Sequence, residues 1–418
     1  ITGSKRRPYA DENHRTKIRR NECGYTRQLV VKKVKEAVDG GYAPIVVVSA
    51  MGRRGDPYAT DTLIEMLRSV NPDPDVHELD LMMACGEIIS STVMASTLQK
   101  EGFKAKALTG GQAGMVTDGN FGNAKIKTVR PKTLKTLVEQ GIIPVICGFQ
   151  GVTDMDGSIT TLGRGGSDTS AAAFGVAVDA EKVEIYTDVD GVMTADPRIV
   201  SDAKIIKQIS YDEIREMAHQ GAKVIHPRAV EIVMRYGVPM VVKSTFSDAP
   251  GTLITTDDKI DTLESQDDVE SNHASGVASL KDLSFFQVDL SQDTSNNGSR
   301  VFKDLASHGV SIGSLSFQPQ SLMFAVYTVN APKAEEVLKA EGYHYTLTKE
   351  CAKVTVVGSH MGGTPGVMAR FVGALTAAGV KILQTTDSDN LVSAIIEERD
   401  VKTAVCALHS AFATQEGE

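Results

Sequence analysis

The sequence lacks any pair of closely spaced cysteines. Its five cysteines are odd in number and lie far apart along the 418 residues. Isolated thiols of this kind are typical of a reducing compartment, and they form neither a disulfide framework nor a CxxC-type zinc site. We therefore expect buried free thiols. The five residues are Cys23, Cys85, Cys147, Cys351 and Cys406.

Long hydrophobic runs and an excess of positive charge are also absent. The longest apolar runs, residues 44–51 and 142–147, are far shorter than the roughly 20 residues that cross a bilayer. The net charge of −9 argues against nonspecific binding to nucleic acid or membranes, and no secretory signal pattern is visible. We expect a cytoplasmic protein with no nucleic-acid or membrane partner, folded into roughly two or three domains.

Short strand-like runs alternate with helical patterns through residues 28–243. Residues 45–48 form a continuous apolar run, as in a strand buried on both faces of a sheet. The alternation predicts an α/β domain with a largely parallel sheet, in which ligands bind beyond the carboxyl ends of the strands. Further strands are predicted at 104–108, 143–147, 183–186 and 240–243, and helices at 28–38, 61–70, 77–99, 132–139, 211–219 and 227–235.

The C-terminal part of the chain has a different pattern. Residues 257–273 are acidic and poor in apolar side chains, which predicts a linker. After it the order strand, helix, strand, strand, helix occurs twice, which predicts two βαββαβ units of about 70 residues each. The predicted domains are residues 28–256, the linker, 274–342 and 343–418, with residues 1–27 set apart as anomalous.

Residues 161–173, TLGRGGSDTSAAA, combine a glycine-rich turn with the start of a helix. Ser, Asp and Thr oxygens accept the orphan amides of a first helical turn, and the alanines favour helix. Glycines permit close backbone approach to a ligand, a helix N-terminus favours an anion, and Arg164 suits a carboxylate or phosphate. The segment by itself is equally consistent with a capped surface helix.

Three other features could carry chemistry. The loop 186–191, YTDVDG, could hydrogen-bond the base and sugar of a nucleotide, or it could be a plain turn. Lys223 precedes a proline-initiated helix, where its ammonium could meet phosphates or simply lie at the surface. Glu87 lies on a helix that is otherwise poor in charge, where it could pair with a substrate ammonium or face solvent at the helix edge.

Six sequence blocks occur in a fixed order, and together they closely resemble the blocks of aspartate kinases in the amino-acid kinase superfamily. The two C-terminal repeats resemble the paired ACT domains of that family, and the resemblance extends over about residues 28–412. It implies an αβα sandwich with a largely parallel central sheet, followed by two ferredoxin-like ACT domains. The blocks are VVVSAMG (46–52), ATDTLI (59–64), CGE (85–87), the GFQG to GRGGSDTSA stretch (148–171), YTDVDGVMTADPR (186–198) and GAKVIHPRA (221–229).

The resemblance implies ATP-dependent phosphorylation of the β-carboxylate of L-aspartate, with Mg²⁺ on the ATP phosphates. A carboxylate is already ionised at pH 7, so positioning and charge stabilisation are the main requirements. Arg164 would bind the α-carboxylate of aspartate and Glu87 its ammonium, and Asp168 would orient the phosphate-binding lysines. By similarity the substrate residues are Ser49, Thr60, Glu87, Arg164, Gly165, Gly166 and Ser167; the catalytic residues are Asp168, Lys223 and Lys17; and the nucleotide residues are Thr187, Asp188, Gly191, Thr194, Asp196, Arg198, Lys223 and Val224.

The ACT resemblance further implies feedback control and a homo-oligomer assembled through the ACT domains. The effector would be an amino-acid end product, for which we favour lysine or diaminopimelate. Its predicted site is the loop 295–299 with the strand 311–315, and comprises Asn296, Asn297, Gly298, Ser299 and Ile312.

The N-terminal segment departs from the family pattern. Aspartate kinases begin with a strand that ends in KFGGTS, whose lysine and glycines surround the transferring phosphate. Here residues 17–22 read KIRRNE, so Arg19 and Arg20 replace glycines and would obstruct close backbone approach. As written, the segment is expected to leave a strand missing from the sheet. The chain is then expected to have little or no kinase activity.

A shift of one base explains this departure. Suitable codons for residues 11–26, DENHRTKIRRNECGYT, yield MRIIVQKFGGTSVAT when read one base later. We interpret the segment as out-of-frame translation, with the frame restored near residues 26–28. The alternative function is a catalytically impaired amino-acid sensor that keeps its ACT domains, and ATP binding would distinguish the two.

Overall fold

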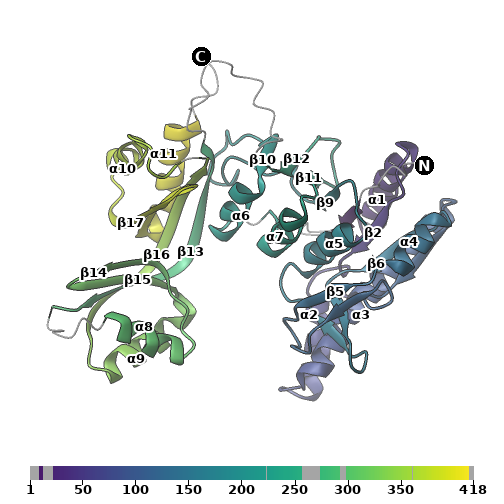
Figure 1. Cartoon of the computed structure of the whole chain (residues 1–418), viewed down its shortest axis with the longest axis horizontal. Helices are drawn as coiled ribbons and strands as arrows, with labels where there is room; N and C mark the ends of the chain where they lie inside the picture. Colours follow the sequence, from purple (N-terminus) through teal and green to yellow (C-terminus); the bar gives the residue numbers. More distant parts are fainter. Residues whose placement is uncertain are drawn as a thin grey trace, which may run out of the picture. The chain divides into compact units, whose positions relative to one another are not determined.

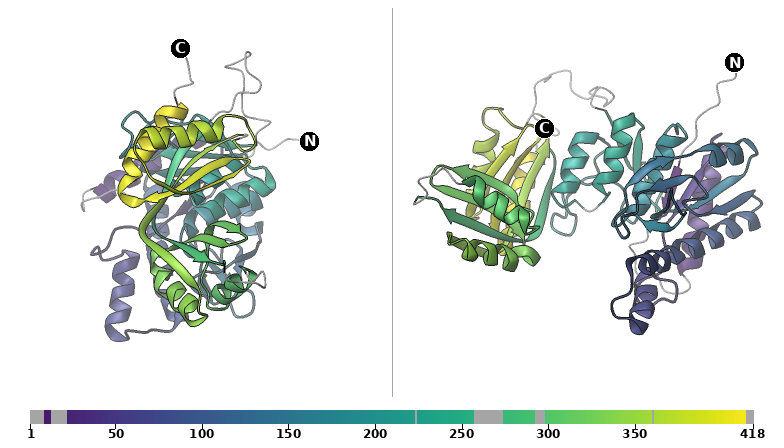
Figure 2. Two further views of the ribbon diagram at one scale, coloured as in Figure 1. Left: turned by 90° about the vertical axis from the view of Figure 1, so that its left-hand side faces the viewer. Right: turned by 60° about the horizontal axis from the view of Figure 1, so that its bottom comes forward.

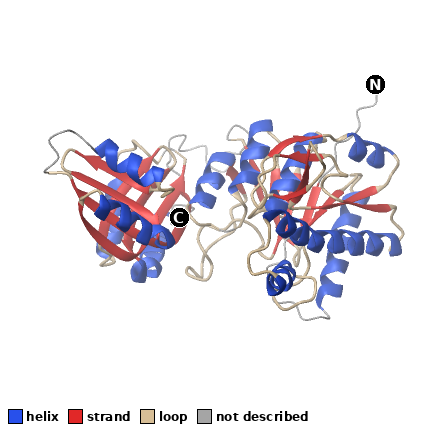
Figure 3. Ribbon diagram, turned by 90° about the horizontal axis from the view of Figure 1, so that it is seen from below, coloured by secondary structure: helices blue, strands red, loops and turns tan. Residues whose placement is uncertain are grey.

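The computed structural model describes residues 9–12, 22–222, 224–256, 274–291, 298–359 and 361–413. Its elements form two units (Figure 1). The first comprises Ile1–Val192, Ile205–Arg215 and Lys223–Asp261, and the second comprises Met193–Lys204, Glu216–Ala222 and Thr262–Glu418. In both units helices flank the sheets (Figure 3).

An eight-stranded sheet forms the centre of the first unit. Every neighbouring pair is parallel except β11 with β12, which confirms the predicted parallel sheet. The order across the sheet is β10 (Gln208–Ser210), β12 (Thr252–Thr255), β11 (Met240–Ser244), β9 (Val183–Thr187), β1 (Tyr9–Glu12), β2 (Ile45–Val48), β6 (Ile143–Cys147) and β3 (Ala105–Leu108).

Helices cover both faces of this sheet. Val34 of α1 (Glu22–Asp39) and Leu98 of α3 (Val76–Lys100) pack over Val46 and Val48 of β2. Successive strand residues point to opposite faces, and Val47 is also fully buried, so the other face is covered too. There α5 (Gly166–Ala177) contacts β1, β2 and β9 and packs on α7 (Pro227–Tyr236). The remaining helices are α2 (Thr60–Val70), α4 (Lys132–Glu139) and α6 (Tyr211–His219).

Helix α3 is long and apolar enough to span a membrane by length and composition alone. However, it carries two buried carboxylates, Asp80 and Glu87, and it packs against β2, β3 and β6 of the sheet. These are the contacts of a core helix in a globular protein.

A second, four-stranded sheet of the first unit was not predicted. Its order is β5 (Ile126–Val129), β4 (Met115–Thr117), β7 (Gln150–Thr153) and β8 (Ile159–Thr161). These strands have only three or four residues and include Gly, Gln and Thr, so no alternation was long enough to detect. The last strand of this sheet, β8, ends at Thr161, directly before the predicted substrate residue Arg164.

The prediction that the N-terminal segment leaves a strand missing is wrong. Residues Tyr9–Glu12 form β1, which pairs in parallel with both β2 and β9 at the centre of the sheet. Helix α1 also starts earlier than predicted, at Glu22 rather than at residue 28. A strand can form here without a hydrophobic sequence because each neighbour offers its backbone groups for pairing.

The second unit contains one six-stranded sheet that both repeats share. Strands β13 (Ala274–Asp289) and β16 (His344–Gly358) pair along their lengths and run through both halves, with α8 (Gly298–Ser307) and α9 (Ala331–Ala340) beside one half and α10 (Val367–Ala377) and α11 (Val401–Ala413) beside the other (Figures 1 and 2). The full order is β14 (Gly313–Gln318), β15 (Ser321–Tyr327), β13, β16, β18 (Leu391–Glu397) and β17 (Ile382–Ser388).

The two repeats therefore exchange strands along the chain. Residues 274–280, which precede the first repeat, pair with residues 353–358 and complete the second repeat, while residues 344–348 pair with residues 285–289 and complete the first. The predicted order strand, helix, strand, strand, helix is confirmed in both repeats, and β13 and β16 each contribute to both of them. Local sequence periodicity could not reveal this, because the pairing joins residues 55 to 84 positions apart.

Candidate active site

The carboxyl ends of β2 and β6 lie against the first turn of α5. A Cβ atom at Gly148, just after β6, would lie 2.9 Å from Ser167 Oγ and 3.0 Å from the Val48 carbonyl oxygen. This glycine therefore allows Ser167 to approach the strand ends. Ser49 follows β2, and its buried Oγ has no hydrogen-bond partner.

Glu87 lies beside the same strand end rather than at a solvent edge. Its side chain is buried, and Oε1 accepts a hydrogen bond from the Ala50 amide at 3.0 Å. Gly86 permits this contact, since a Cβ there would lie 2.7 Å from Ala50 Cβ and 3.4 Å from Thr60 Oγ1. Oε2 of Glu87 is buried without a partner. A buried unpaired carboxylate oxygen is costly, and a substrate ammonium is a suitable partner for it.

Burial raises the pKa of Glu87 to about 8, although the Ala50 amide opposes the shift. When folding raises the pKa of a carboxyl group, the free energy of unfolding falls as the pH rises from the group's ordinary pKa to its pKa in the folded state. We expect Glu87→Gln to raise the melting temperature most above pH 8, where the parent carries the buried charge, and yet to weaken L-aspartate binding. Calorimetric melting at pH 6 and pH 9 tests this, and equal shifts at both pH values would contradict it.

The Arg164 turn is built from glycines with positive φ. Gly163 and Gly165 have φ of 75° and 66°, a region that other residues rarely adopt. A Cβ at Gly165 would lie 2.2 Å from His226 Cγ, so glycine is also required for space. The Arg164 side chain is exposed and makes no hydrogen bond or ion pair with the described residues.

Helix α5 begins earlier than its side chains suggested. Gly165 is the N-cap, Gly166 starts the helix, and Ser167 and Asp168 lie in its first turn. The predicted cap by Ser, Asp or Thr is therefore wrong, because the left-handed Gly165 directs the chain into the helix first. Gly166, Ser167 and Asp168 are all buried, and an acidic side chain in a first turn interacts favourably with the helix dipole.

Two charged residues that the sequence analysis missed hold this turn. Asp80 of α3 accepts hydrogen bonds from Thr161, and Arg228 of α7 donates to the Leu162 carbonyl at 3.0 Å and the Ala124 carbonyl at 2.9 Å. Burial lowers the pKa of Arg228. Asp80 could have been noticed, because it lies seven positions before Glu87 and hence on the same helix face.

The predicted nucleotide loop begins in the first unit. Thr187 ends β9, and its hydroxyl donates to Asp188 Oδ1 at 3.1 Å. A Cβ at Gly191 would lie 2.7 Å from Thr252 Oγ1, and that hydroxyl accepts a hydrogen bond from the Val192 amide at 2.8 Å. Thr187, Asp188 and Gly191 thus share one loop at the carboxyl end of β9.

The rest of the loop belongs to the second unit. Ala195 is part of the core that includes Leu408, and Thr194 Oγ1 lies 2.9 Å from Nε2 of the buried His409. Asp196 and Arg198 pair with each other, with Nη2 to Oδ2 at 2.6 Å, and Arg198 holds the pKa of Asp196 below its usual range.

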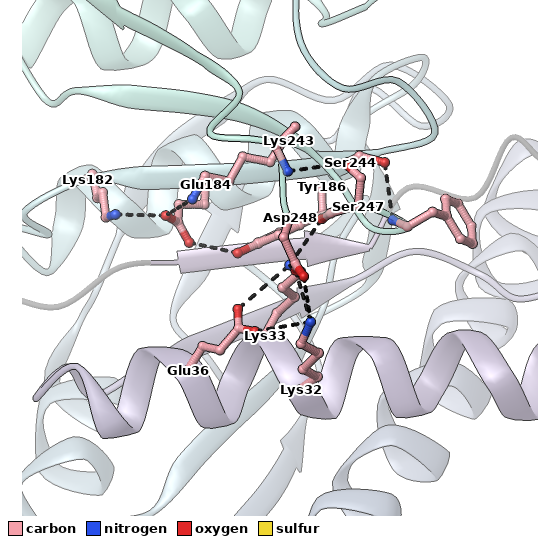
Figure 4. Close-up of polar contacts among 12 residues, drawn as sticks. Lys32, Lys33, Glu36, Lys182, Glu184, Tyr186, Lys243, Ser244, Ser247 and Asp248 are labelled. Carbon is pink, nitrogen blue, oxygen red and sulfur yellow. Dashed lines mark hydrogen bonds and ion pairs between the residues drawn. The ribbon is translucent and has the colours of Figure 1, made fainter.

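A network of paired charges supports the loop in the first unit (Figure 4). Lys32 and Lys33 of α1 contact Asp248 at 2.9 and 2.7 Å, and Ser247 next to it donates to Asp190 Oδ1 at 2.6 Å. Asp190 lies in the predicted nucleotide loop, so α1 is linked to that loop through the β11–β12 connection. The network borders a cavity of about 290 Å³, whose lining includes Lys33, Glu36, Tyr186, Lys243 and Asp248.

Several predicted site residues lie outside the described part of the chain. They are Lys17, Lys223, Asn296 and Asn297. Val224 is partly buried in the turn before α7. Of the predicted effector residues that are described, Ile312 packs against the core of the first ACT repeat, and Gly298 starts α8 where a Cβ would lie 2.0 Å from the Phe317 ring. Among the described residues, no group of three metal-ligating side chains could hold an ion.

The fold and this site define a class of protein: a small-molecule kinase whose α/β domain is followed by paired ACT repeats. Comparisons with known proteins agree. A model of the amino acid kinase family matches residues 18–244, and an ACT domain model matches residues 346–410. Aspartokinase 1 of Bacillus subtilis is 44% identical over 386 residues, which cover 92% of this chain and 95% of the relative. The chain belongs to the aspartokinases of the amino acid kinase family.

Solved structures show the same fold. Escherichia coli aspartokinase III in complex with aspartate and ADP, the R-state, has a TM-score of 0.76 at 22% identity and covers 97% of this chain and 99% of its own. The same enzyme in complex with lysine and aspartate, the T-state, has a TM-score of 0.70 at 21% identity and covers 97% of this chain and 99% of its own.

Proposed function

We propose that this chain transfers the γ-phosphoryl group of ATP to the β-carboxylate of L-aspartate, which gives ADP and 4-phospho-L-aspartate. The observation that supports this best is the buried Glu87, whose unpaired Oε2 suits the ammonium of an amino acid. The aspartate and ADP bound by the E. coli relative are consistent with it. The reaction would be the first step of lysine, threonine and methionine synthesis.

The proposed mechanism depends on positioning. Arg164 binds the α-carboxylate, Glu87 the ammonium, and Ser49, Thr60 and the amides of Gly165, Gly166 and Ser167 surround the β-carboxylate. An oxygen of that carboxylate attacks the γ-phosphorus, the bond to the bridging oxygen breaks, and ADP leaves with the electron pair. Asp168 orients Lys223 and, where present, the N-terminal lysine, which neutralise charge on the transferring group.

The nucleotide would be held by Thr187, Asp188 and Gly191 together with Thr194, Asp196, Arg198 and Val224. Mg²⁺ would arrive with ATP and would neutralise charge on its phosphates. The carboxylate of Asp188 is the chemically suited protein donor in this loop. An ADP-release assay of the frame-restored chain with L-aspartate tests the proposed reaction.

We also propose feedback inhibition by lysine or diaminopimelate through the ACT repeats, with a homo-oligomer assembled through them. The lysine complex of the E. coli relative supports the choice of ligand. Thr194 and Ala195 pack within the second unit, and their loop also carries predicted ATP contacts. This supports a route from the effector to the nucleotide through that loop.

We expect His409→Ala to reduce the inhibition by lysine at least fivefold, since coupling between sites is typically about 1–3 kcal/mol and this change removes the hydrogen bond to Thr194. The measurement is the ratio of KM for ATP with and without saturating lysine. His308→Ala is the matched control, because His308 is exposed on the loop after α8 and contacts only its own helix end. Undiminished inhibition in His409→Ala would contradict the route.

The origin of residues 1–27 is a further proposal. We propose that they are an out-of-frame product, and that the chain with the restored segment is the active kinase. The second candidate function is an amino-acid sensor without kinase activity. The chain as written lacks the KFGGTS segment, which favours this candidate. Nucleotide binding separates the two candidates, because a sensor would bind lysine but not ATP.

A further inference from the structure

Asp80 is a fully buried carboxylate that the proposed chemistry does not use. Both of its oxygens accept hydrogen bonds from the Gly122 amide, at 3.0 and 2.9 Å. Oδ2 also accepts from the Thr161 amide at 2.7 Å, and Oδ1 accepts from Thr161 Oγ1 at 2.8 Å. Its exposed fraction is 0%. No cation is among these partners, so three donor groups on two loops satisfy the charge.

These two loops meet directly before the Arg164 turn. The Ala124 amide donates to the Thr161 carbonyl at 2.8 Å, and the Leu162 amide donates to the Phe149 carbonyl at 2.8 Å. Arg228 holds the carbonyls of Leu162 and Ala124 from α7. Every backbone N–H and C=O group of Thr161 and Leu162 is therefore hydrogen-bonded, so the Arg164 turn begins from a fixed point.

Helix α3 connects this fixed point to the ammonium site. Asp80 and Glu87 are seven positions apart on one continuous helix, which is about 10 Å at a rise of 1.5 Å per residue. Glu87 holds the Ala50 amide, and Asp80 holds Thr161. The rigid helix α3 therefore sets the distance between the carboxyl group of Glu87 and the start of the Arg164 turn. Glu87 is the proposed partner of the substrate ammonium, and Arg164 is the proposed partner of the substrate carboxylate.

We propose that Asp80 is a positioning residue that fixes the Arg164 turn relative to Glu87, and so fits the site to a ligand whose ammonium and carboxylate share one carbon. This inference rests on the proposed function of the site. Asp80 does not touch the substrate; it acts through Thr161 and the Arg164 turn. If the role of Asp80 were purely structural, its substitution would change the stability of the chain and would not weaken the binding of L-aspartate more than that of the nucleotide.

The test compares Asp80→Asn with the parent in the full chain. The amide keeps the size of the side chain but places a donor against the amides of Gly122 and Thr161. We expect the dissociation constant for L-aspartate to rise at least tenfold, while that for the nucleotide ADP changes less than twofold. Thr161→Val removes only the hydroxyl donor, and we expect it to weaken aspartate binding about threefold; it decides the question if Asp80→Asn does not fold.

Asp156→Asn is the matched control. Asp156 also accepts a backbone amide, that of Ser158 at 3.1 Å, but it lies at the exposed β7–β8 turn. In hydrogen exchange of the ligand-free chains, Asp80→Asn should accelerate exchange in residues 121–125 and 160–166, and Asp156→Asn should not. Unchanged exchange there would overturn the positioning role, whatever the substrate.

A double variant shows whether the effect passes through Arg164. If it does, Asp80→Asn should weaken aspartate binding little further in a chain that already carries Arg164→Ala. Additive losses would overturn the inference. If the parent and its frame-restored form bind ADP but not L-aspartate, the proposed function fails. The hydrogen-exchange result does not depend on the substrate, so it still shows whether Asp80 fixes the Arg164 turn.

Discussion

A chain in which MRIIVQKFGGTSVAT replaces residues 11–26 is expected to turn over L-aspartate at least about a thousandfold faster than the chain as written. The restored lysine and glycine amides would surround the transferring phosphate, and a single well-placed donor of this kind is typically worth about 100- to 1,000-fold in kcat. Two arginines occupy the corresponding positions in the chain as written. Steady-state ADP release from both chains measures the difference.

The control for this experiment is the restored chain with the lysine of its KFGG segment changed to alanine. It should lose most of the gained activity while its melting temperature stays the same. Equal activity of the restored and unrestored chains would contradict the frame interpretation. Sequencing the gene across these codons gives an independent answer, because codons that cannot be read as the shifted sequence would exclude it.

The second large effect is expected for Arg164→Ala, which should raise KM for L-aspartate about a hundredfold. A hydrogen bond to a charged group contributes about 1.5–3 kcal/mol, and a guanidinium can make two such bonds to a carboxylate. Folding should be unaffected, since Arg164 is exposed and its turn is shaped by Gly163 and Gly165. KM for ATP should remain within about twofold, because the change removes no predicted nucleotide contact.

Arg130→Ala is the control for Arg164→Ala. Arg130 is also an arginine with a largely exposed side chain, but it pairs with Asp154 at 2.8 Å on the four-stranded sheet. It should leave both KM values unchanged. A loss confined to kcat in Arg164→Ala would contradict a role in substrate binding and would place this arginine on the transferring phosphate instead.

The long elements were readable from the sequence because each has its own periodicity. Helices α4 and α6 have the predicted bounds, Lys132–Glu139 and Tyr211–His219, and β2 and β6 were recognised as buried apolar runs. Parts of β13 and β16 were predicted as strands, but their sharing by both repeats was not, since partners 55 to 84 positions away decide where each half belongs. β1 was missed because its residues, YADE, carry no strand pattern.

The candidate site was predictable to the extent that it lies in short motifs. Glu87 and the Arg164 turn were recognised from their own neighbours in the sequence. Asp80 and Arg228 were not, because their roles depend on contacts with residues 81 and 66 positions away. The division of the nucleotide loop between two units was also invisible, since Thr194 and His409 are 215 positions apart.

The most direct test of the central claim is to trap the product as a hydroxamate. The frame-restored chain is incubated with ATP, Mg²⁺, hydroxylamine and either L-aspartate or succinate, which lacks the ammonium that Glu87 is proposed to bind. Hydroxylamine attacks the acyl phosphate, and inorganic phosphate leaves. We expect ATP-dependent hydroxamate with L-aspartate and at least about a hundredfold less with succinate, since the missing group leaves the buried carboxylate unpaired. Equal yields from the two acids, or no hydroxamate with L-aspartate, would contradict it.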